Sequence, residues 1–131
     1  MKLRLVCQDR WVLYAVCTDR GDCPLLEFLR EADPSSHVAK TKRQMIRRLE
    51  TIARTGMTQV TEISHQISGD IWQIEKGDLR ILYFYDRERV IILSHGFVKR
   101  SRKTPRSEIQ RAQEALQRYR AERDRIQILE D

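Results

Sequence analysis

The segment 71–105 constrains the fold more than any other part of the chain. It reads IWQIEKGDLRILYFYDRERVIILSHGFVKRSRKTP, with three runs of β-branched and aromatic residues separated by short polar connections. Runs of this kind joined by a few turn residues are typical of consecutive antiparallel strands. We therefore expect strands at 71–75, 79–85 and 89–95, with turns at 76–78 and 86–88.

The expected strand 79–85 is apolar on both of its faces. Side chains alternate along a strand, so one face carries Leu79, Ile81, Tyr83 and Tyr85 and the other carries Arg80, Leu82 and Phe84. Two apolar faces indicate a central strand that is covered by helices on at least one side. The charge of Arg80 within it is costly unless it has a partner or faces a polar surface.

Helical signals precede this strand region. Pro24 opens a short helix, which the pair Asp33-Pro34 ends. A longer helix, capped by Ser35 or Ser36, runs to about Arg54. Its apolar residues recur at helical spacing: Val38, Met45, Ile46, Leu49, Ile52 and Ala53. Gly56 suits the left-handed position just past its end.

Three further segments complete the expected elements. A strand is indicated at 11–17 and another at 60–67, while 1–8 is either a short extra strand or a loose end. Thr104-Pro105 marks the start of a last helix, in which Glu114 and Arg118 can pair. We predict an α+β fold with an N-terminal strand, a helical hairpin, an antiparallel sheet of three to four strands and a C-terminal helix.

Length and charge limit the class of protein. A chain of 131 residues predicts a single domain spanning 1–131, with a core at about 11–119 and a C-terminal tail that frays. The net charge of +6 indicates an anionic partner, although a basic protein can also lack one. Two basic blocks favour the partner: Lys40, Lys42, Arg43, Arg47, Arg48 and Arg54, and then Lys99, Arg100, Arg102, Lys103, Arg106 and Arg111.

The cysteines and histidines argue against disulfides and metals. Three irregularly spaced cysteines do not form a disulfide framework, and no histidine lies at metal-ligand spacing. We expect no metal and no cofactor. The N-terminus lacks the apolar run of a signal peptide and no window is long enough to span a membrane, so we expect a cytoplasmic protein without a membrane partner.

Several short motifs occur together in a specific order. They are CPLLEFL at 23–29, WQI at 72–74, LRILYF at 79–84, HGFVK at 95–99, KTP at 103–105 and the pair Glu108-Ile109. In this order and spacing, the chain resembles the RelE/ParE toxin superfamily of toxin–antitoxin modules over about 11–119. The likeness is greatest to the HigB-like branch, which includes phage-derived members.

The resemblance implies a compact RelE-like toxin that is neutralised by a cognate antitoxin, which we expect to be a helix-turn-helix protein. Many such toxins enter the ribosomal A site and cut mRNA, so the ribosome and mRNA are further expected partners. The ParE-like relatives inhibit DNA gyrase instead. The HigB-like features favour a ribosome-dependent mRNA endonuclease, or mRNA interferase.

Metal-independent RNA cleavage uses the ribose 2′-hydroxyl as the nucleophile against the adjacent phosphate. An arginine can stabilise the charge that develops on the phosphate, and the resemblance implies this role for Arg80. Alternatively, Arg80 pairs with Glu75 or Asp78 and only stabilises the hairpin. His95 is a candidate for proton transfer, or it forms a hydrogen bond in the interior.

The segment after the strand 89–95 supplies further candidates. Lys99 and Lys103 are expected to act as acid or base, or to bind the RNA backbone with Arg100 and Arg102. Phe97 either stacks on a base or packs beneath the last helix. Lys76 is a phosphate contact or an ordinary turn lysine. His37 and His65 lie elsewhere in the sequence and are expected to be structural or exposed.

One departure from the family pattern affects the catalytic set. Some RelE-like nucleases have two alternating lysines in the strand before the arginine strand, where this chain has Gln73 and Glu75. Glu75 is then the base, or the proton transfers fall to Lys76, His95 and the loop 99–103. The alternatives are a non-cleaving ParE-like or nucleic-acid-binding relative, and a basic domain whose charge serves only an acidic antitoxin.

Overall fold

The computed structural model describes residues 1–31, 36–56 and 64–130. Its elements in chain order are β1 (Lys2–Gln8), β2 (Val12–Val16), α1 (Pro24–Arg30), α2 (His37–Thr55), β3 (Ser64–Ser68), β4 (Ile71–Lys76), β5 (Leu79–Asp86), β6 (Val90–Val98), α3 (Arg106–Ala121), the 3-10 turn η1 (Arg123–Arg125) and β7 (Gln127–Leu129). The α+β class expected from the sequence is confirmed.

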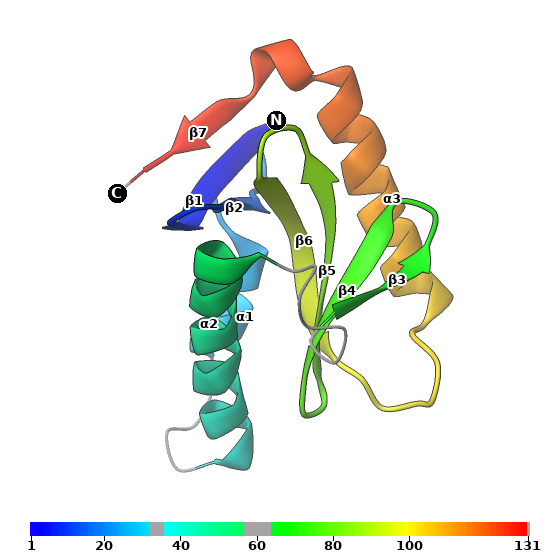
Figure 1. Ribbon diagram of the computed structural model, residues 1–131. Helices are drawn as coiled ribbons and strands as arrows, with labels where there is room; N and C mark the ends of the chain where they lie inside the picture. Colours follow the sequence, from blue (N-terminus) through cyan, green and yellow to red (C-terminus); the bar gives the residue numbers. More distant parts are fainter. Residues whose placement is uncertain (32–35, 57–63, 131) are drawn as a thin grey trace.

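The strands form one seven-stranded sheet in the order β3-β4-β5-β6-β2-β1-β7. The expected antiparallel meander is β3 to β6, and it makes up more than half of the sheet. The sheet extends further because β2 pairs with β6 in parallel, β1 pairs with β2 and β7 pairs with β1. Residues 1–8 therefore hold a strand, and the C-terminal segment pairs with it where we had expected a frayed tail (Figure 1).

Helices cover both faces of the sheet (Figure 1). On one face, α1 and α2 pack on Leu79, Ile81 and Tyr83 of β5 through residues such as Leu25 and Met45. On the other, α3 packs on Leu82 and Phe84 through Ala112, Leu116 and Tyr119. Alternate side chains of β5 therefore belong to two different hydrophobic cores, one on each face of the sheet. β5 is a central strand as predicted.

The boundaries of α2 agree with its capping signals. The Ser36 side chain accepts a hydrogen bond from the backbone N–H of Ala39 at 3.1 Å, and Gly56 follows the helix with φ of 85°. Val38 and Ile46, which we expected on the packing face, are instead exposed. The expected helix break at 33–34 and the first part of the strand 60–67 lie outside the described residues.

Two local predictions at α3 are wrong. Thr104 does not cap the helix: Pro105 occupies the N-cap position, α3 begins at Arg106, and the Thr104 hydroxyl donates to Oε1 of Gln73 at 2.6 Å. Arg118 does not pair with Glu114. It pairs with Glu122 at 2.6 Å and with Asp19 at 2.5 Å, because these carboxylates lie closer to its guanidinium in the folded chain.

Candidate RNA-binding site

A hollow of about 770 Å³ lies where β5 begins and β6 ends. Its lining is mostly cationic and consists of Asp78, Arg80, Val98, Lys99, Arg100, Ser101 and Arg102. The backbone N–H of Lys99 donates to the carbonyl of Asp78 at 2.7 Å, which continues the β5–β6 pairing past the last strand residue. The sheet therefore holds both the strand arginine and the start of the basic loop in one place.

Arg80 bends its guanidinium over the β4–β5 turn. One terminal nitrogen, Nη1, donates to the carbonyls of Gly77 at 2.6 Å and Leu79 at 2.9 Å. Its Nε lies 3.8 Å from Oε1 of Glu75, and it is buried without a hydrogen-bond partner among the described residues. The partners of Arg80 are thus mainly backbone carbonyls, with Glu75 only loosely paired. The other terminal nitrogen, Nη2, has no hydrogen bond among the described residues, so it is the donor that an acceptor outside the chain could use.

A chain of polar side chains crosses β4 on the same face of the sheet. Thr104 donates to Gln73, and Nε2 of Gln73 donates to Oε1 of Glu75 at 2.9 Å. The same carboxylate oxygen lies 3.4 Å from Nδ1 of His65 on β3. Gln73 is 1% exposed, so this chain holds Glu75 in position beside Arg80.

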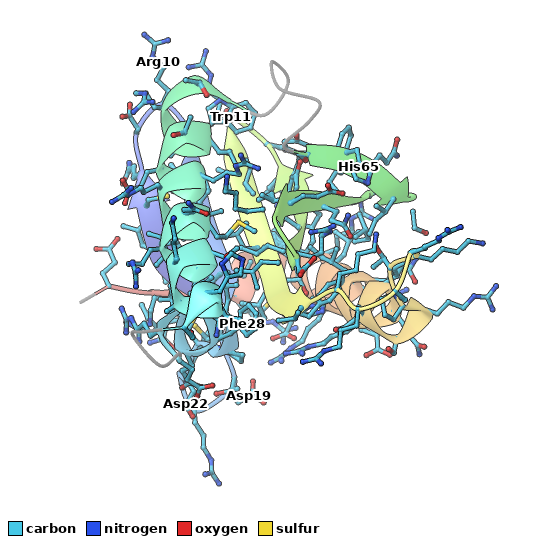
Figure 2. The ribbon with its side chains drawn as sticks, turned by 90° about the horizontal axis from the view of Figure 1, so that it is seen from below. Arg10, Trp11, Asp19, Asp22, Phe28 and His65 are labelled. Atoms are coloured by element: carbon cyan, nitrogen blue, oxygen red, sulfur yellow. The ribbon has the colours of Figure 1, made fainter. Side chains whose placement is uncertain are left out.

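His65 is a residue that the sequence reasoning placed outside the site. His65 lies on β3 (Figure 2), opposite Gln73 of β4, and its exposed side chain reaches Glu75. No local pattern in the sequence indicates this contact, because the register that brings His65 to Glu75 depends on a bulge between Gln66 and Ser68.

His95 lies in the interior of the protein. It is 1% exposed, its Nδ1 is 2.9 Å from the Ser94 hydroxyl, and its Nε2 is 3.2 Å from Oε1 of Glu108. Burial, with a smaller effect from the nearby Arg111 cation, lowers the pKa of His95 to about 4. The imidazole is therefore neutral near pH 7 and does not line the hollow, so the structure favours the interior hydrogen-bonding interpretation.

Phe97 is also turned inward. It is 8% exposed and packs in the α3 core, with its ring 5.9 Å from that of His95. Stacking on an unpaired base requires an accessible ring face. The structure therefore supports the alternative in which Phe97 packs beneath the last helix.

The loop cations are exposed, and Lys99 is half-buried at the exit of β6. Among the described residues, none of Lys99, Arg100, Arg102 and Lys103 forms an ion pair, while Ser101 donates to the carbonyl of Lys103 at 2.8 Å. Figure 2 shows nitrogen-tipped side chains extending from this loop into solvent. Cations without an intramolecular partner are available to phosphate groups.

Lys76 lies on the opposite face of the sheet from Arg80. It lines a pocket of about 300 Å³ with Gln44, Arg47, Arg48 and Thr51 of α2. Of the basic block 40–54, Lys42 turns inward, where it is 6% exposed and its ammonium group lies 4.3 Å from the centre of the Phe28 ring. The structure thus separates Lys76 from the other predicted site residues and places it on a second basic surface.

Other classes of site find no support in the described part of the chain. No group of three histidine, cysteine or acidic side chains there could hold a metal ion. The three cysteines are free thiols. None of the described helices is long and apolar enough to cross a membrane.

The fold and the site together define a small α+β protein whose central sheet presents an arginine and a basic loop at one end. The family model "Phage derived protein Gp49-like (DUF891)" matches residues 27–117, which is most of the chain. The chain therefore belongs to this Gp49-like family, a RelE/ParE-like family whose members are commonly toxins of toxin–antitoxin systems. A comparison with curated proteins gives no match.

Proposed function

We propose that this protein is the toxin of a toxin–antitoxin system and acts as a ribosome-dependent mRNA endonuclease of the HigB-like type. The observation that carries the proposal is the position of Arg80, whose guanidinium lines the same hollow as Lys99, Arg100 and Arg102. Its Nη2 has no hydrogen bond among the described residues, so this nitrogen can donate to a phosphate oxygen. Arginine also suits phosphate because its fork matches two oxygens.

In this proposal the scissile phosphate binds at Arg80 and the flanking phosphates bind the loop 99–103. Cleavage forms a bond between the 2′-oxygen and phosphorus and breaks the bond from phosphorus to the 5′-oxygen. Glu75 accepts the proton of the 2′-hydroxyl, because its carboxylate is fixed 3.8 Å from Nε of Arg80. Lys99 donates a proton to the leaving oxygen, with Lys103 as the second candidate, and Arg80 stabilises the negative charge between these steps.

His95 and Phe97 have supporting parts in this proposal. Both residues are buried and do not contact RNA. They hold the end of β6 against α3 and so position the loop 99–103, which connects these two elements. The ribosome supplies the orientation of the mRNA, which is why we expect little cleavage of free RNA.

A second candidate function is a toxin that blocks its target without cutting, as the ParE-like inhibitors of DNA gyrase do. The burial of His95 favours it, because that removes the one histidine of the basic segment from the surface. Glu75 also already accepts a hydrogen bond from Gln73. The cationic hollow serves either candidate.

The test compares cells that express the wild type, Arg80→Ala, Arg80→Lys or Arg87→Ala, with growth and the 5′ ends of cellular mRNA as readouts. Arg87 is a matched control because it is an exposed arginine in the turn at the opposite end of β5. We expect translation-dependent cuts with wild type and Arg87→Ala, and a loss of at least about 100-fold with Arg80→Ala at equal protein level. Arg80→Lys keeps the charge but loses the fork and should fall between them.

One result would contradict the nuclease, and another would contradict the role of Arg80. Growth arrest with intact mRNA in the wild type would point to the non-cleaving candidate, and gyrase activity would then be measured. Unchanged cleavage in Arg80→Ala would show that Arg80 only stabilises the hairpin.

A further inference from the structure

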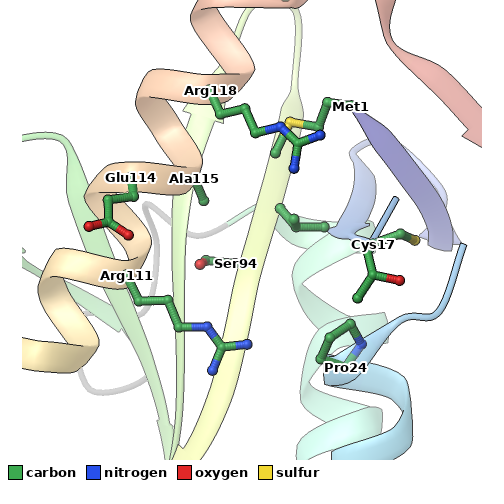
Figure 3. Close-up of a pocket in the computed structure, with 10 residues that line it drawn as sticks. Met1, Cys17, Pro24, Ser94, Arg111, Glu114, Ala115 and Arg118 are labelled. Atoms are coloured by element: carbon green, nitrogen blue, oxygen red, sulfur yellow. The ribbon is translucent and has the colours of Figure 1, made fainter. Parts of the chain in front are cut away.

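A separate pocket of about 300 Å³ lies between α3, β6 and the start of α1 (Figure 3). Arg111 and Arg118 reach into it from α3, Ser94 contributes its hydroxyl from β6, and Val16, Pro24 and Ala115 form apolar walls. We call it the α3 pocket. It shares no lining residue with the hollow at Arg80.

The charges around the α3 pocket are nearly balanced. Arg118 is paired with Asp19 and Glu122, and Glu122 also accepts from the N-terminal ammonium group at 2.6 Å. The Glu114 carboxylate accepts from Gln110 at 3.2 Å and points away from the pocket (Figure 3).

Arg111 is the exception in this balance. Within residues 1–31, 36–56 and 64–130 it has no hydrogen bond or ion pair, and its guanidinium extends toward β6 (Figure 3). One uncompensated cation beside a hydroxyl and apolar walls suits a ligand with a single negative charge and an aliphatic part.

A polyanion fits this pocket poorly. Asp19 and Glu122, which pair with Arg118, repel additional phosphates. The described residues that line the pocket include no aromatic ring on which a base could stack. A carboxylate fits well, because a guanidinium can bind both of its oxygens. A peptide supplies a carboxylate and an aliphatic side chain a few residues apart, so it matches the charge and the apolar walls together.

We propose that the α3 pocket receives an acidic side chain of the cognate antitoxin, with its carboxylate on Arg111 and a neighbouring aliphatic side chain against Val16, Pro24 and Ala115. This inference rests on the toxin assignment, which implies an antitoxin partner, but it does not depend on RNA cleavage. It gives the antitoxin a docking point away from the hollow at Arg80.

A hydrogen-bonded chain runs from the α3 pocket to the first turn of α3. Ser94 at the pocket binds Nδ1 of His95, and Nε2 of His95 faces Glu108 in the first turn of α3, directly after the basic loop. A carboxylate on Arg111 therefore changes the electrostatic surroundings of His95, on which Arg111 already acts. The ring signals of His95 in an NMR spectrum provide a readout of occupancy that does not require activity.

The experiment measures binding of the purified antitoxin encoded beside this chain by titration calorimetry, for wild type, Arg111→Gln and Arg106→Gln. Arg106 is a matched control because it is exposed on the same helix and does not line the pocket. We expect Arg111→Gln to raise the Kd at least roughly tenfold, and Arg106→Gln to change it less than about twofold. Expressed alone, Arg111→Gln should still arrest growth, while the antitoxin neutralises it less well.

Several outcomes would overturn the inference. In the calorimetry, these are an unchanged Kd for Arg111→Gln, an equal loss of affinity for Arg111→Gln and Arg106→Gln, or no binding of the antitoxin by the wild type. In the NMR spectrum, it is a response of the His95 signals to a single-stranded RNA oligonucleotide but not to the antitoxin. Ala115→Phe, which fills the pocket from its apolar wall, is a second variant that should weaken binding while keeping the wild-type circular dichroism spectrum. If mRNA stays intact in cells, the proposed nuclease fails, but the comparison of affinities still decides this inference.

Discussion

His95 and Glu108 connect the end of β6 to the first turn of α3, with Nε2 of His95 3.2 Å from Oε1 of Glu108. The twelve-residue interval between His95 and Glu108 contains the whole basic loop. The contact between His95 and Glu108 holds the two ends of this interval together, so the loop has a fixed position on the protein. The cations of the loop itself form no ion pair with any described residue.

The buried imidazole predicts a pH dependence of stability. The pKa of His95 is about 4 in the folded chain, against about 6.5 when it is unfolded. As the pH falls from 6.5 to 4, the unfolded state takes up a proton that the folded state does not, so the free energy of unfolding drops by up to about 3 kcal/mol. Above pH 6.5 this effect is absent. Urea unfolding at several pH values should show a smaller drop for His95→Gln, and an identical drop would contradict the prediction.

Glu75→Gln separates a catalytic role of Glu75 from a structural one. Glutamine keeps the size of the side chain and the oxygen that accepts from Gln73, so the free energy of unfolding should change by less than about 1 kcal/mol. If Glu75 is the base, cleavage of ribosome-bound mRNA falls by about 10² to 10⁴. Full activity in this variant would move the base to another group.

The packing around Gly96 leaves no room for a side chain between His95 and Phe97. A Cβ atom at this position would lie 2.9 Å from two atoms of the Phe28 ring and 3.1 Å from Leu25. Gly96→Ala should therefore destabilise the protein by about 1–3 kcal/mol in urea unfolding. In a Phe28→Ala background the same change should cost much less, and an equal cost would show that the clash with Phe28 is not the cause.

The second basic surface predicts an effect on binding without an effect on chemistry. Lys76 and Arg47 line the pocket on the α2 face, away from Arg80. Lys76→Ala and Arg47→Ala should each reduce by about one the slope of log affinity against log salt for ribosomes or RNA. Single-turnover cleavage of bound mRNA should keep its rate, and a slower rate would place Lys76 in the catalytic site after all.

Much of the fold could be predicted from local patterns. The strands expected at 71–75, 79–85 and 89–95 match β4, β5 and most of β6, and the division of β5 into two apolar faces follows from the same alternation. The cap of α2 was expected at Ser35 or Ser36, and the structure has it at Ser36. The pairing of β2 with β6 and of β7 with β1 could not be read this way, because it joins segments far apart in the chain and leaves no periodic signal. The error at Thr104 has the same origin, since its hydroxyl binds Gln73, 31 residues earlier.

The class of the protein, the apolar core of the sheet and the nearness of Arg80 to the basic loop could be read from the chain, because each depends on nearby residues or on one alternating pattern. Which polar side chains are accessible depends on how the elements pack. The tertiary structure buried His95 and Phe97, placed Lys76 on the opposite face and left Arg111 in the α3 pocket without an ion pair to any described residue. Burial and long-range pairing depend on how distant segments pack, and that information is spread over the whole chain.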